Sequence, residues 1–371
     1  MSADSSGARR PTGRRRLRWL IVGALALLLT VSSLVTWKAI ERQSPHALGP
    51  LPTFAAGTSP GRERALEVLG QPVSGGRWLS GIWAGGGTAS ASRVEAFGTW
   101  RGTPTDAATT YPATATWETL KGSNWHIATF QGFGGVLVYG LPLLPDNDVG
   151  ALGAVADGQH DDVFRQVAKD LVANGRGASI VRVGWEANGD WFPWNATSST
   201  ADDYKAAFRH VVGVLRSEAP SLIIDFDLGC GVSLRGQQDR LDALTLLYPG
   251  DDAVDLVGCD TYDWHTTTST DEASWTRTMR PLDAVGIADV ADFARAHSKG
   301  MTVPEWGLAS PDEGGVGDNV VFIEKMRSFF EQNSDVVVLE SYFSEPETSL
   351  RNSIWDPVQN ERASRRYQEL W

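Results

Sequence analysis

The chain has 371 residues, of which 42% are hydrophobic and 21% are charged, and its formal net charge is −12 at pH 7. This length and apolar content exclude a wholly disordered chain and favour a folded domain with a sizeable core. After residue 43 the acidic bias is stronger, because 43 acidic side chains stand against 25 basic ones. A surface of that sign excludes nucleic acid as the expected partner, since binding would have to offset phosphate charge.

An arginine-rich stretch opens the chain and precedes an uncharged apolar run. Residues 1–18 are expected to stay in the cytoplasm, because positive side chains mark the inner side of a membrane segment. Residues 19–37 are long and apolar enough for a transmembrane signal anchor, which would make the protein single-pass with its folded domain extracytoplasmic. A cleaved secretory signal is the alternative, and it would release the protein from the membrane.

Residues 38–75 are rich in proline, glycine and serine, and this composition predicts a linker. Residues 76–371 then form one domain, of a length that is ordinary for a (β/α)8 barrel.

Within that domain, short apolar runs alternate with segments of helical periodicity. The predicted strands lie at 77–83, 106–111, 136–144, 178–181, 222–228, 254–262, 301–303 and 336–339. The predicted helices include 93–100, 161–173, 204–215 and 320–330. This alternation indicates the α/β class, a (β/α)8 TIM barrel preceded by a single N-terminal transmembrane helix, with its active site at the carboxyl ends of the strands.

Two glutamates follow predicted strands. Glu186 comes after the fourth strand with Trp185 and Trp191 nearby, and Glu305 comes after the seventh. Glycosidic bond cleavage needs such a pair, because one carboxylic acid protonates the leaving oxygen while the second group attacks or activates water. A separation of roughly 5 Å between the two would imply retention of configuration. Taken singly, each glutamate could instead be a surface or salt-bridged residue.

Residues 182–194 read Arg-x-x-x-Glu-x-Asn-Gly-x-Trp-Phe-x-Trp, and residues 303–307 read Val-Pro-Glu-Trp-Gly. The first stretch resembles the acid/base signature of glycoside hydrolase family 26, the β-mannanase family of clan A, and the second resembles its nucleophile segment. Weaker support extends from residue 77 to residue 370.

The resemblance implies specific roles for four residues. Glu186 would be the acid/base and Glu305 the nucleophile of a retaining glycoside hydrolase that works by double displacement. Tyr262 would hold Glu305 through a hydrogen bond, and Arg182 would be a supporting charge beneath Glu186.

One position departs from the family pattern, since the mannanases usually carry His where this chain has Trp185. An indole offers one N–H donor and no acceptor, and it adds an apolar face. The resemblance is therefore closest to a branch with Gly-Trp-Glu, and the expected substrate is a β-linked polysaccharide, mannan-like or a related β-glycan. Two alternatives stay open, a non-catalytic glycan-binding barrel tethered to the membrane and a transglycosylase that remodels an envelope polysaccharide.

The chain has 15 tryptophans, more than a barrel core requires, and the apolar face of a pyranose can stack on an indole. A structural role remains the alternative for each candidate. The candidate substrate-binding residues are Trp185, Asn188, Trp191, Trp194, Trp264 and Trp306. Four further carboxylates lie on predicted strands and are reserve candidates for the catalytic pair, namely Asp225, Asp227, Asp260 and Glu340.

Only two cysteines occur, Cys230 and Cys259, near the ends of two predicted neighbouring strands. Either a disulfide or two buried thiols would fit, because a bridge also needs Cα atoms within about 7 Å. No Cys/His cluster has the spacing of a zinc site, so neither a metal nor a cofactor is expected.

Overall fold

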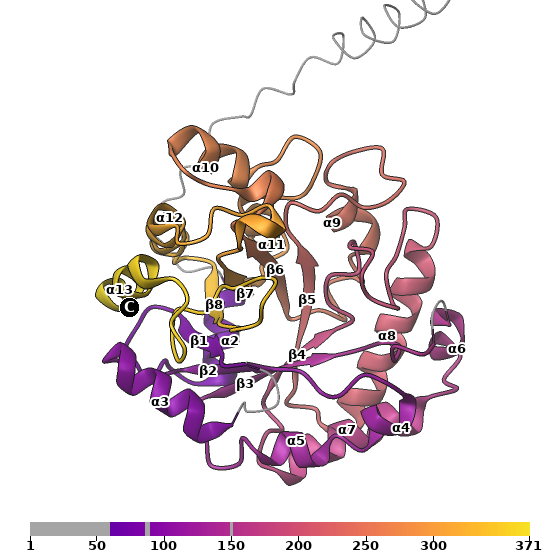
Figure 1. Ribbon diagram of the computed structural model, residues 1–371. Helices are drawn as coiled ribbons and strands as arrows, with labels where there is room; N and C mark the ends of the chain where they lie inside the picture. Colours follow the sequence, from indigo (N-terminus) through magenta and orange to yellow (C-terminus); the bar gives the residue numbers. More distant parts are fainter. Residues whose placement is uncertain (1–59, 86–89, 149–150) are drawn as a thin grey trace, which may run out of the picture. The chain divides into compact units, whose positions relative to one another are not determined.

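The computed structural model describes residues 60–85, 90–148 and 151–371 (Figure 1). In this part of the chain, eight parallel strands form a closed barrel in the order of the sequence. The strands are β1 (Leu79–Trp83), β2 (Ala107–Thr110), β3 (Val136–Leu141), β4 (Ile180–Val183), β5 (Ile223–Gly229), β6 (Leu256–Tyr262), β7 (Gly300–Gly307) and β8 (Val337–Phe343). The predicted (β/α)8 architecture is therefore confirmed.

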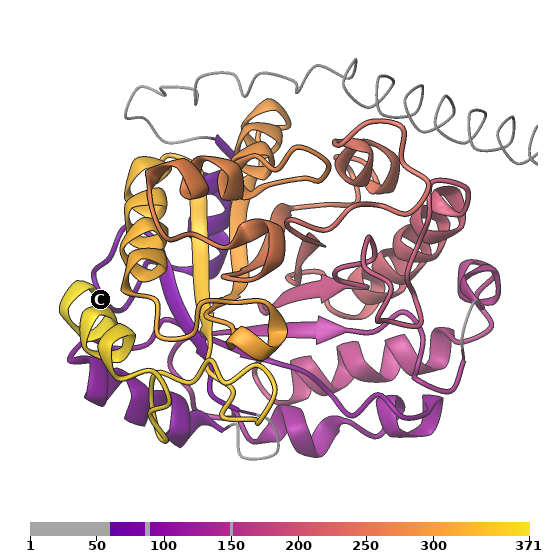
Figure 2. The same cartoon turned by 45° about the horizontal axis from the view of Figure 1, so that its top comes forward.

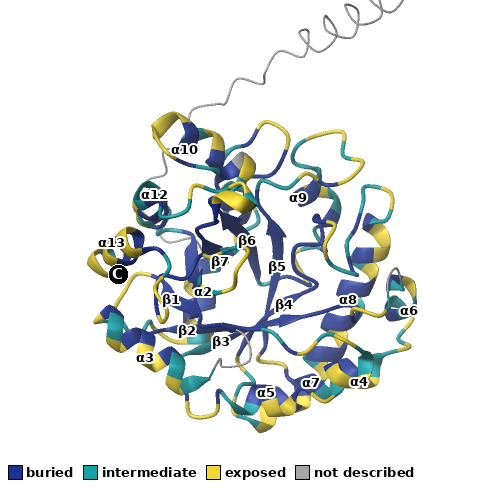
Figure 3. Ribbon diagram, viewed as in Figure 1, coloured by how far each residue is buried: buried dark blue, intermediate teal, exposed yellow. Residues whose placement is uncertain are grey.

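Helices surround the barrel and bury their apolar faces against its strands (Figures 2 and 3). They are α3 (Ala91–Arg101), α4 (Trp117–Lys121), α5 (Asn124–Ala128), α6 (Leu152–Ala156), α7 (Asp161–Ala173), α8 (Ala201–Glu218), α9 (Asp242–Leu247), α10 (Glu272–Met279), α11 (Ile287–Ala296), α12 (Val320–Gln332) and α13 (Glu361–Leu370). Helix α7 has the predicted bounds, because its apolar residues recur with a clear helical period.

Two strands are longer than predicted. Strand β7 continues through Glu305 to Gly307, and β8 continues through Ser341 to Phe343. Both extensions contain polar residues, such as Glu305 and Ser341, and these interrupt the apolar run in the sequence. The two strands nevertheless stay paired along the extensions. Hydrophobic patterning alone therefore ends these strands too early.

One further helix, α2 (Pro60–Leu69), lies inside the range 38–75 that we expected to be a linker. Its Ala65 and Leu66 are buried in one cluster with residues near the beginnings of the strands, such as Leu79 and Ala107. Arg62 Nε also donates to the carbonyl of Val337 at 3.2 Å. The folded part thus begins before residue 76, because α2 covers the end of the barrel where the strands start.

The predicted cytoplasmic segment 1–18 and signal anchor 19–37 lie outside the described residues. Among the residues that the structure does describe, no helix has both the length and the apolar character needed to cross a membrane.

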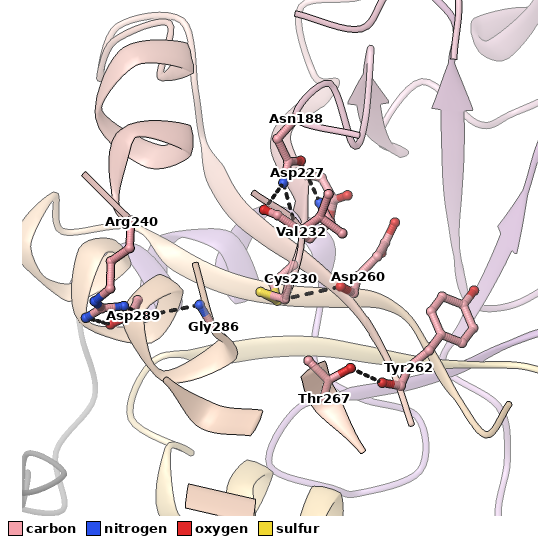
Figure 4. The surroundings of a disulfide bond; sticks show 12 residues. Asn188, Asp227, Cys230, Val232, Arg240, Asp260, Tyr262, Thr267, Gly286 and Asp289 are labelled. Atoms are coloured by element: carbon pink, nitrogen blue, oxygen red, sulfur yellow. Dashed lines mark hydrogen bonds and ion pairs between the residues drawn. A yellow bond between two sulfur atoms is a disulfide. The ribbon is translucent and has the colours of Figure 1, made fainter. Parts of the chain in front are cut away.

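A disulfide joins Cys230, just after β5, to Cys259 in β6 (Figure 4). The two Cα atoms lie 5.7 Å apart, and both residues are buried. The backbone N–H of Cys230 donates to the carbonyl of Asp260 at 2.8 Å. The sequence left open either a disulfide or two buried thiols, and the structure has the disulfide. It ties the residue after β5 to the middle of β6.

Candidate active site

The turn after β4 carries Glu186 into the mouth of the barrel through two residues with left-handed backbone conformations. Gly184 has φ 52° and Glu186 has φ 51°. A Cβ on Gly184 would also lie 2.6 Å from a side-chain carbon of Leu143, so glycine is required there by both conformation and space. A glutamate in this region is strained, and such strain is characteristic of functional sites.

Glu186 lies in a poorly hydrated position, with 8% of its surface exposed. Burial raises the pKa of Glu186 to about 8, and the negative charges of Glu305 and Asp227 add to the shift. The indole of Trp191 donates to Glu186 Oε2 at 2.9 Å. The carboxyl is therefore protonated at neutral pH, as a general acid must be.

Glu305, near the end of β7, receives hydrogen bonds on both of its carboxylate oxygens. Tyr262 donates to Oε2 at 2.7 Å, and Arg182 donates to Oε1 at 2.7 Å. The hydroxyl of Tyr111 also donates to Oε1. The expected contact between Tyr262 and Glu305 is thus present, and this set of donors suits an ionised carboxylate.

Arg182 makes its contacts with groups other than Glu186. Its guanidinium is fully buried, and Nη2 contacts Asp227 at 2.8 Å as well as Asp260. Its direct hydrogen bond to a member of the proposed pair goes to Glu305. The positive charge still acts on Glu186 at longer range by lowering its pKa.

Three of the reserve carboxylates lie in the barrel around this arginine. Burial raises the pKa of Asp227 to about 6 and that of Asp260 well above its usual value. Asp225 accepts a hydrogen bond from Thr302 at 2.6 Å, and burial followed by the charge of Asp227 raises its pKa to about 7. The pKa values of these acids rise because burial makes their charged forms costly, and the single buried arginine offsets only part of that cost.

The fourth reserve carboxylate, Glu340, lies elsewhere. It accepts hydrogen bonds from Ser80 and from the indoles of Trp306 and Trp371. In the part of the chain that is described, none of these three side chains is hydrogen-bonded to Glu186 or Glu305.

Aromatic rings line the site in an unbroken series. Each ring contacts the next, with centroid separations between 5.0 and 5.9 Å. In order they are Trp185, Tyr111, Trp83, Phe343, Tyr262 and Trp264. Sequence reasoning missed Tyr111, Trp83 and Phe343, although each stands at the end of a predicted or observed strand, which is where a barrel places functional residues.

Three predicted substrate contacts are wrong. Trp306 is fully buried and packs outside the barrel against Phe330 and other rings. Trp194 is 1% exposed, and its indole donates to the carbonyl of Trp185 at 2.8 Å. The amide of Asn188 is used within the protein, as both its oxygen and its nitrogen bind the backbone of Gly229 (Figure 4).

The other candidates reach the site to different degrees. Trp191 is 46% exposed beside Glu186, and Trp264 is partly exposed beside Tyr262. Trp185 is almost buried, with its ring 5.1 Å from that of Tyr111 and 5.7 Å from the guanidinium carbon of Arg182. Trp191 and Trp264 are therefore the candidates whose faces a sugar can reach most readily, while Trp185 forms the wall behind them.

No group of three or more His, Cys, Asp or Glu side chains within the described ranges could hold a metal ion.

Comparison with known proteins identifies the relatives of this segment. Residues 161–299 match the glycosyl hydrolase family 26 model, which confirms the resemblance to that family over the stretch containing Glu186 and Tyr262. The chain is 34% identical over 153 residues to endoglucanase H of Acetivibrio thermocellus, and 32% identical over 138 residues to a mannan endo-1,4-beta-mannosidase of Bifidobacterium adolescentis. These alignments cover 38% and 36% of this chain and only 14% and 13% of the two relatives.

Solved structures show the same fold at low identity. A modular endo-β-1,4-mannanase from Cellulomonas fimi superposes with a TM-score of 0.60 and 16% identity, covering 85% of this chain and 76% of that protein. The catalytic domain of a family 26 endo-β-1,4-mannanase from Bacillus sp. JAMB-750 gives a TM-score of 0.54 and 18% identity, covering 77% and 81%.

Proposed function

We propose that this chain, a relative of glycosyl hydrolase family 26, is a retaining glycoside hydrolase that cleaves a β-linked polysaccharide by double displacement. The observation that carries the proposal is the contrast between two carboxyl groups in one site. Glu186 is buried with its pKa raised to about 8, whereas Glu305 receives donors on both oxygens. Such a pair provides one acid and one nucleophile.

In the first step, a carboxylate oxygen of Glu305 attacks the anomeric carbon and forms an ester bond to the sugar. The bond between that carbon and the glycosidic oxygen breaks, and the oxygen takes the proton of Glu186 as it leaves. Glu186 is then an anion, and Glu305 is neutral in the covalent intermediate.

In the second step, the ionised Glu186 removes a proton from a water molecule as its oxygen attacks the same carbon. The bond to Glu305 breaks, and its electron pair returns to the carboxylate, whose charge Arg182 stabilises. Glu186 is protonated again, so the site is ready for another cycle. Two inversions at one carbon retain the β configuration.

We propose a mannan-like polymer or a related β-glycan as the substrate. The names of the two curated relatives, an endoglucanase and a mannan endo-1,4-beta-mannosidase, support this class. The partly exposed indoles of Trp191 and Trp264 provide faces on which pyranose rings can stack. A strongly acidic chain is compatible with a neutral glycan.

We also propose that the barrel works outside the cytoplasm. The disulfide between Cys230 and Cys259 supports this location, because such bonds persist in oxidising compartments. The membrane anchor remains a prediction from residues 19–37.

Product release by the purified protein from mannans, β-glucans, xylans and cell-envelope polysaccharides tests the proposal. Wild type should release oligosaccharides or sugars from one β-linked class, while Glu186→Gln and Glu305→Gln should be slower by about 100-fold or more on the natural polymer. Equal release by wild type and Glu305→Gln would refute the mechanism. Glycan binding without release would instead indicate a binding protein.

A further inference from the structure

Tyr111, which directly follows β2, places its hydroxyl between Arg182 and Glu305. Nη1 of Arg182 donates to the phenolic oxygen at 2.5 Å. The hydroxyl in turn donates to Oε1 of Glu305, the oxygen to which Nη1 also donates at 2.7 Å. The three groups therefore form a closed triangle of hydrogen bonds around one carboxylate oxygen.

Only one arrangement of protons satisfies this triangle. A guanidinium can only donate, so the phenolic oxygen must accept from Arg182 and its single proton must point to Glu305. Burial raises the pKa of Tyr111 well above its usual value, so the phenol keeps this proton throughout the ordinary pH range. Tyr111 is thus a fixed donor to Glu305.

The barrel is also shaped to hold the ring of Tyr111. A Cβ on Gly140 in β3 would lie 2.4 and 2.5 Å from two carbons of that ring, closer than side chains pack. The indoles of Trp83 and Trp185 contact the ring from β1 and from the turn after β4, with centroids 5.2 and 5.1 Å away. Gly140 therefore leaves space for the tyrosine, and the two indoles fix its position.

We propose that Tyr111 is a third catalytic residue, one that donates to the attacking carboxylate of Glu305 and stabilises its charge when the glycosyl ester breaks. This inference rests on the proposed function and adds a residue to it. The donor matters most when Glu305 is ionised, in the free enzyme and as the carboxylate departs in the second step. A donor preset toward developing charge contributes to catalysis because the site need not reorganise.

Tyr111→Phe tests the proposal, with Tyr139→Phe as the matched control. Tyr139 is a buried tyrosine of β3 whose hydroxyl bonds Ser123 at 3.2 Å, away from both glutamates. We expect Tyr111→Phe to lower kcat by about 10- to 100-fold, the usual effect of losing a hydrogen bond to a charged group. The acidic limb of its kcat/KM profile should also move to higher pH, because an ionised carboxylate has lost a donor. A loss no greater than that of Tyr139→Phe, with an unmoved acidic limb, would overturn the proposal.

Gly140→Ala gives a second, independent perturbation, since it keeps the hydroxyl but displaces the ring. It should reproduce the shift of the acidic limb, and a wild-type profile would contradict the assigned role of the ring position.

A readout without turnover separates this inference from the proposed function. The hydroxyl stabilises the fold through its hydrogen bond to the charged Glu305, so Tyr111→Phe should lower the melting temperature more in the wild-type background than in a Glu305→Gln background. Tyr139→Phe should lower it equally in both backgrounds. An equal loss in both backgrounds for Tyr111→Phe would refute the donor role whether or not a substrate has been found, whereas an inactive wild type would refute the proposed function alone.

Discussion

At the scale of single residues, the two glutamates are suited to different chemical roles because their surroundings differ. Glu186 is held in a left-handed turn with a single indole donor, and burial raises its pKa to about 8. Glu305 is surrounded by a guanidinium and two phenols. The motifs at 182–194 and 303–307 sufficed to single out the two glutamates. They could not reveal Tyr111, because nothing in the sequence around residue 111 signals a contact with a residue on β7.

The indole of Trp191 contributes to the pH dependence of the acid. Burial raises the pKa of Glu186, while the hydrogen bond from the indole to Oε2 favours the ionised form and so lowers that pKa. Trp191→Phe removes this donor, and the pKa should rise from about 8. We expect the basic limb of the kcat/KM profile to lie near pH 8 in wild type and higher in Trp191→Phe.

Trp125→Phe is the control for that profile, because Trp125 is an exposed indole of α5 with 60% of its surface accessible. It should leave the basic limb where wild type has it. If the basic limb of the kcat/KM profile stays at the wild-type pH in Trp191→Phe, then ionisation of Glu186 does not cause the loss of activity at high pH.

At the scale of elements, the site depends on how neighbouring strand ends are held. Asn188 binds the backbone of Gly229 at the end of β5, and a Cβ on Gly229 would lie 3.3 Å from Glu186 Oε1. The next residue, Cys230, is bridged to β6. The sequence predicted every strand and left the disulfide open. It did not predict the hydrogen bonds between Asn188 and Gly229, because an asparagine at this position could equally bind a sugar.

The disulfide should therefore affect both stability and activity. Its cysteines are 29 residues apart, and a closed loop of that size typically contributes about 3–4 kcal/mol. Replacing both cysteines by serine should lower the free energy of unfolding by about that amount, and the melting temperature with it. It should also reduce kcat, because Gly229 would be held beside Glu186 by the Asn188 hydrogen bonds without the bridge at the next residue. Thermal unfolding and initial rates measure the two effects.

Because the bridge is buried, wild type must be reduced with dithiothreitol in denaturant and refolded in the reductant, after which it should reproduce the properties of the double-serine variant. An unchanged melting temperature in both cases would contradict the stabilising role of the bridge.

At the scale of the whole molecule, the barrel interior places acidic groups around one buried arginine. Asp225, Asp227 and Asp260 all have raised pKa values, with burial as the first cause. A carboxyl whose pKa is higher in the fold than in the unfolded chain destabilises the protein as pH rises between the two values. The alternation of strands and helices predicted the barrel. Only the closed structure shows that Asp227 and Asp260 contact the same arginine, Arg182, while Asp225 binds Thr302.

Asp225→Asn should therefore stabilise the protein in a pH-dependent manner. The folded-state pKa of Asp225 is about 7, well above the usual value of 3.8, so its destabilising effect grows from about pH 4 to pH 7. An asparagine can still accept the hydrogen bond from Thr302 and cannot ionise. The gain in unfolding free energy should be about 1–3 kcal/mol larger at pH 8 than at pH 5.

Denaturant unfolding at the two pH values measures this difference. The exposed Asp202→Asn in α8, a residue whose side chain is 96% accessible, serves as the control and should show no such trend. A gain for Asp225→Asn that does not depend on pH would contradict the raised pKa.

The central claim is that Glu305 forms a covalent bond with the sugar, and mass spectrometry of the trapped protein tests it most directly. The purified protein is incubated with activated 2-deoxy-2-fluoro β-glycosides of mannose and glucose, then digested and sequenced. The account predicts that one of these reagents adds a single fluorosugar per molecule, attached to Glu305, and that Glu305→Gln stays unlabelled. Attachment to another residue, or hydrolysis of a glycan with inversion of configuration and no adduct, would contradict it.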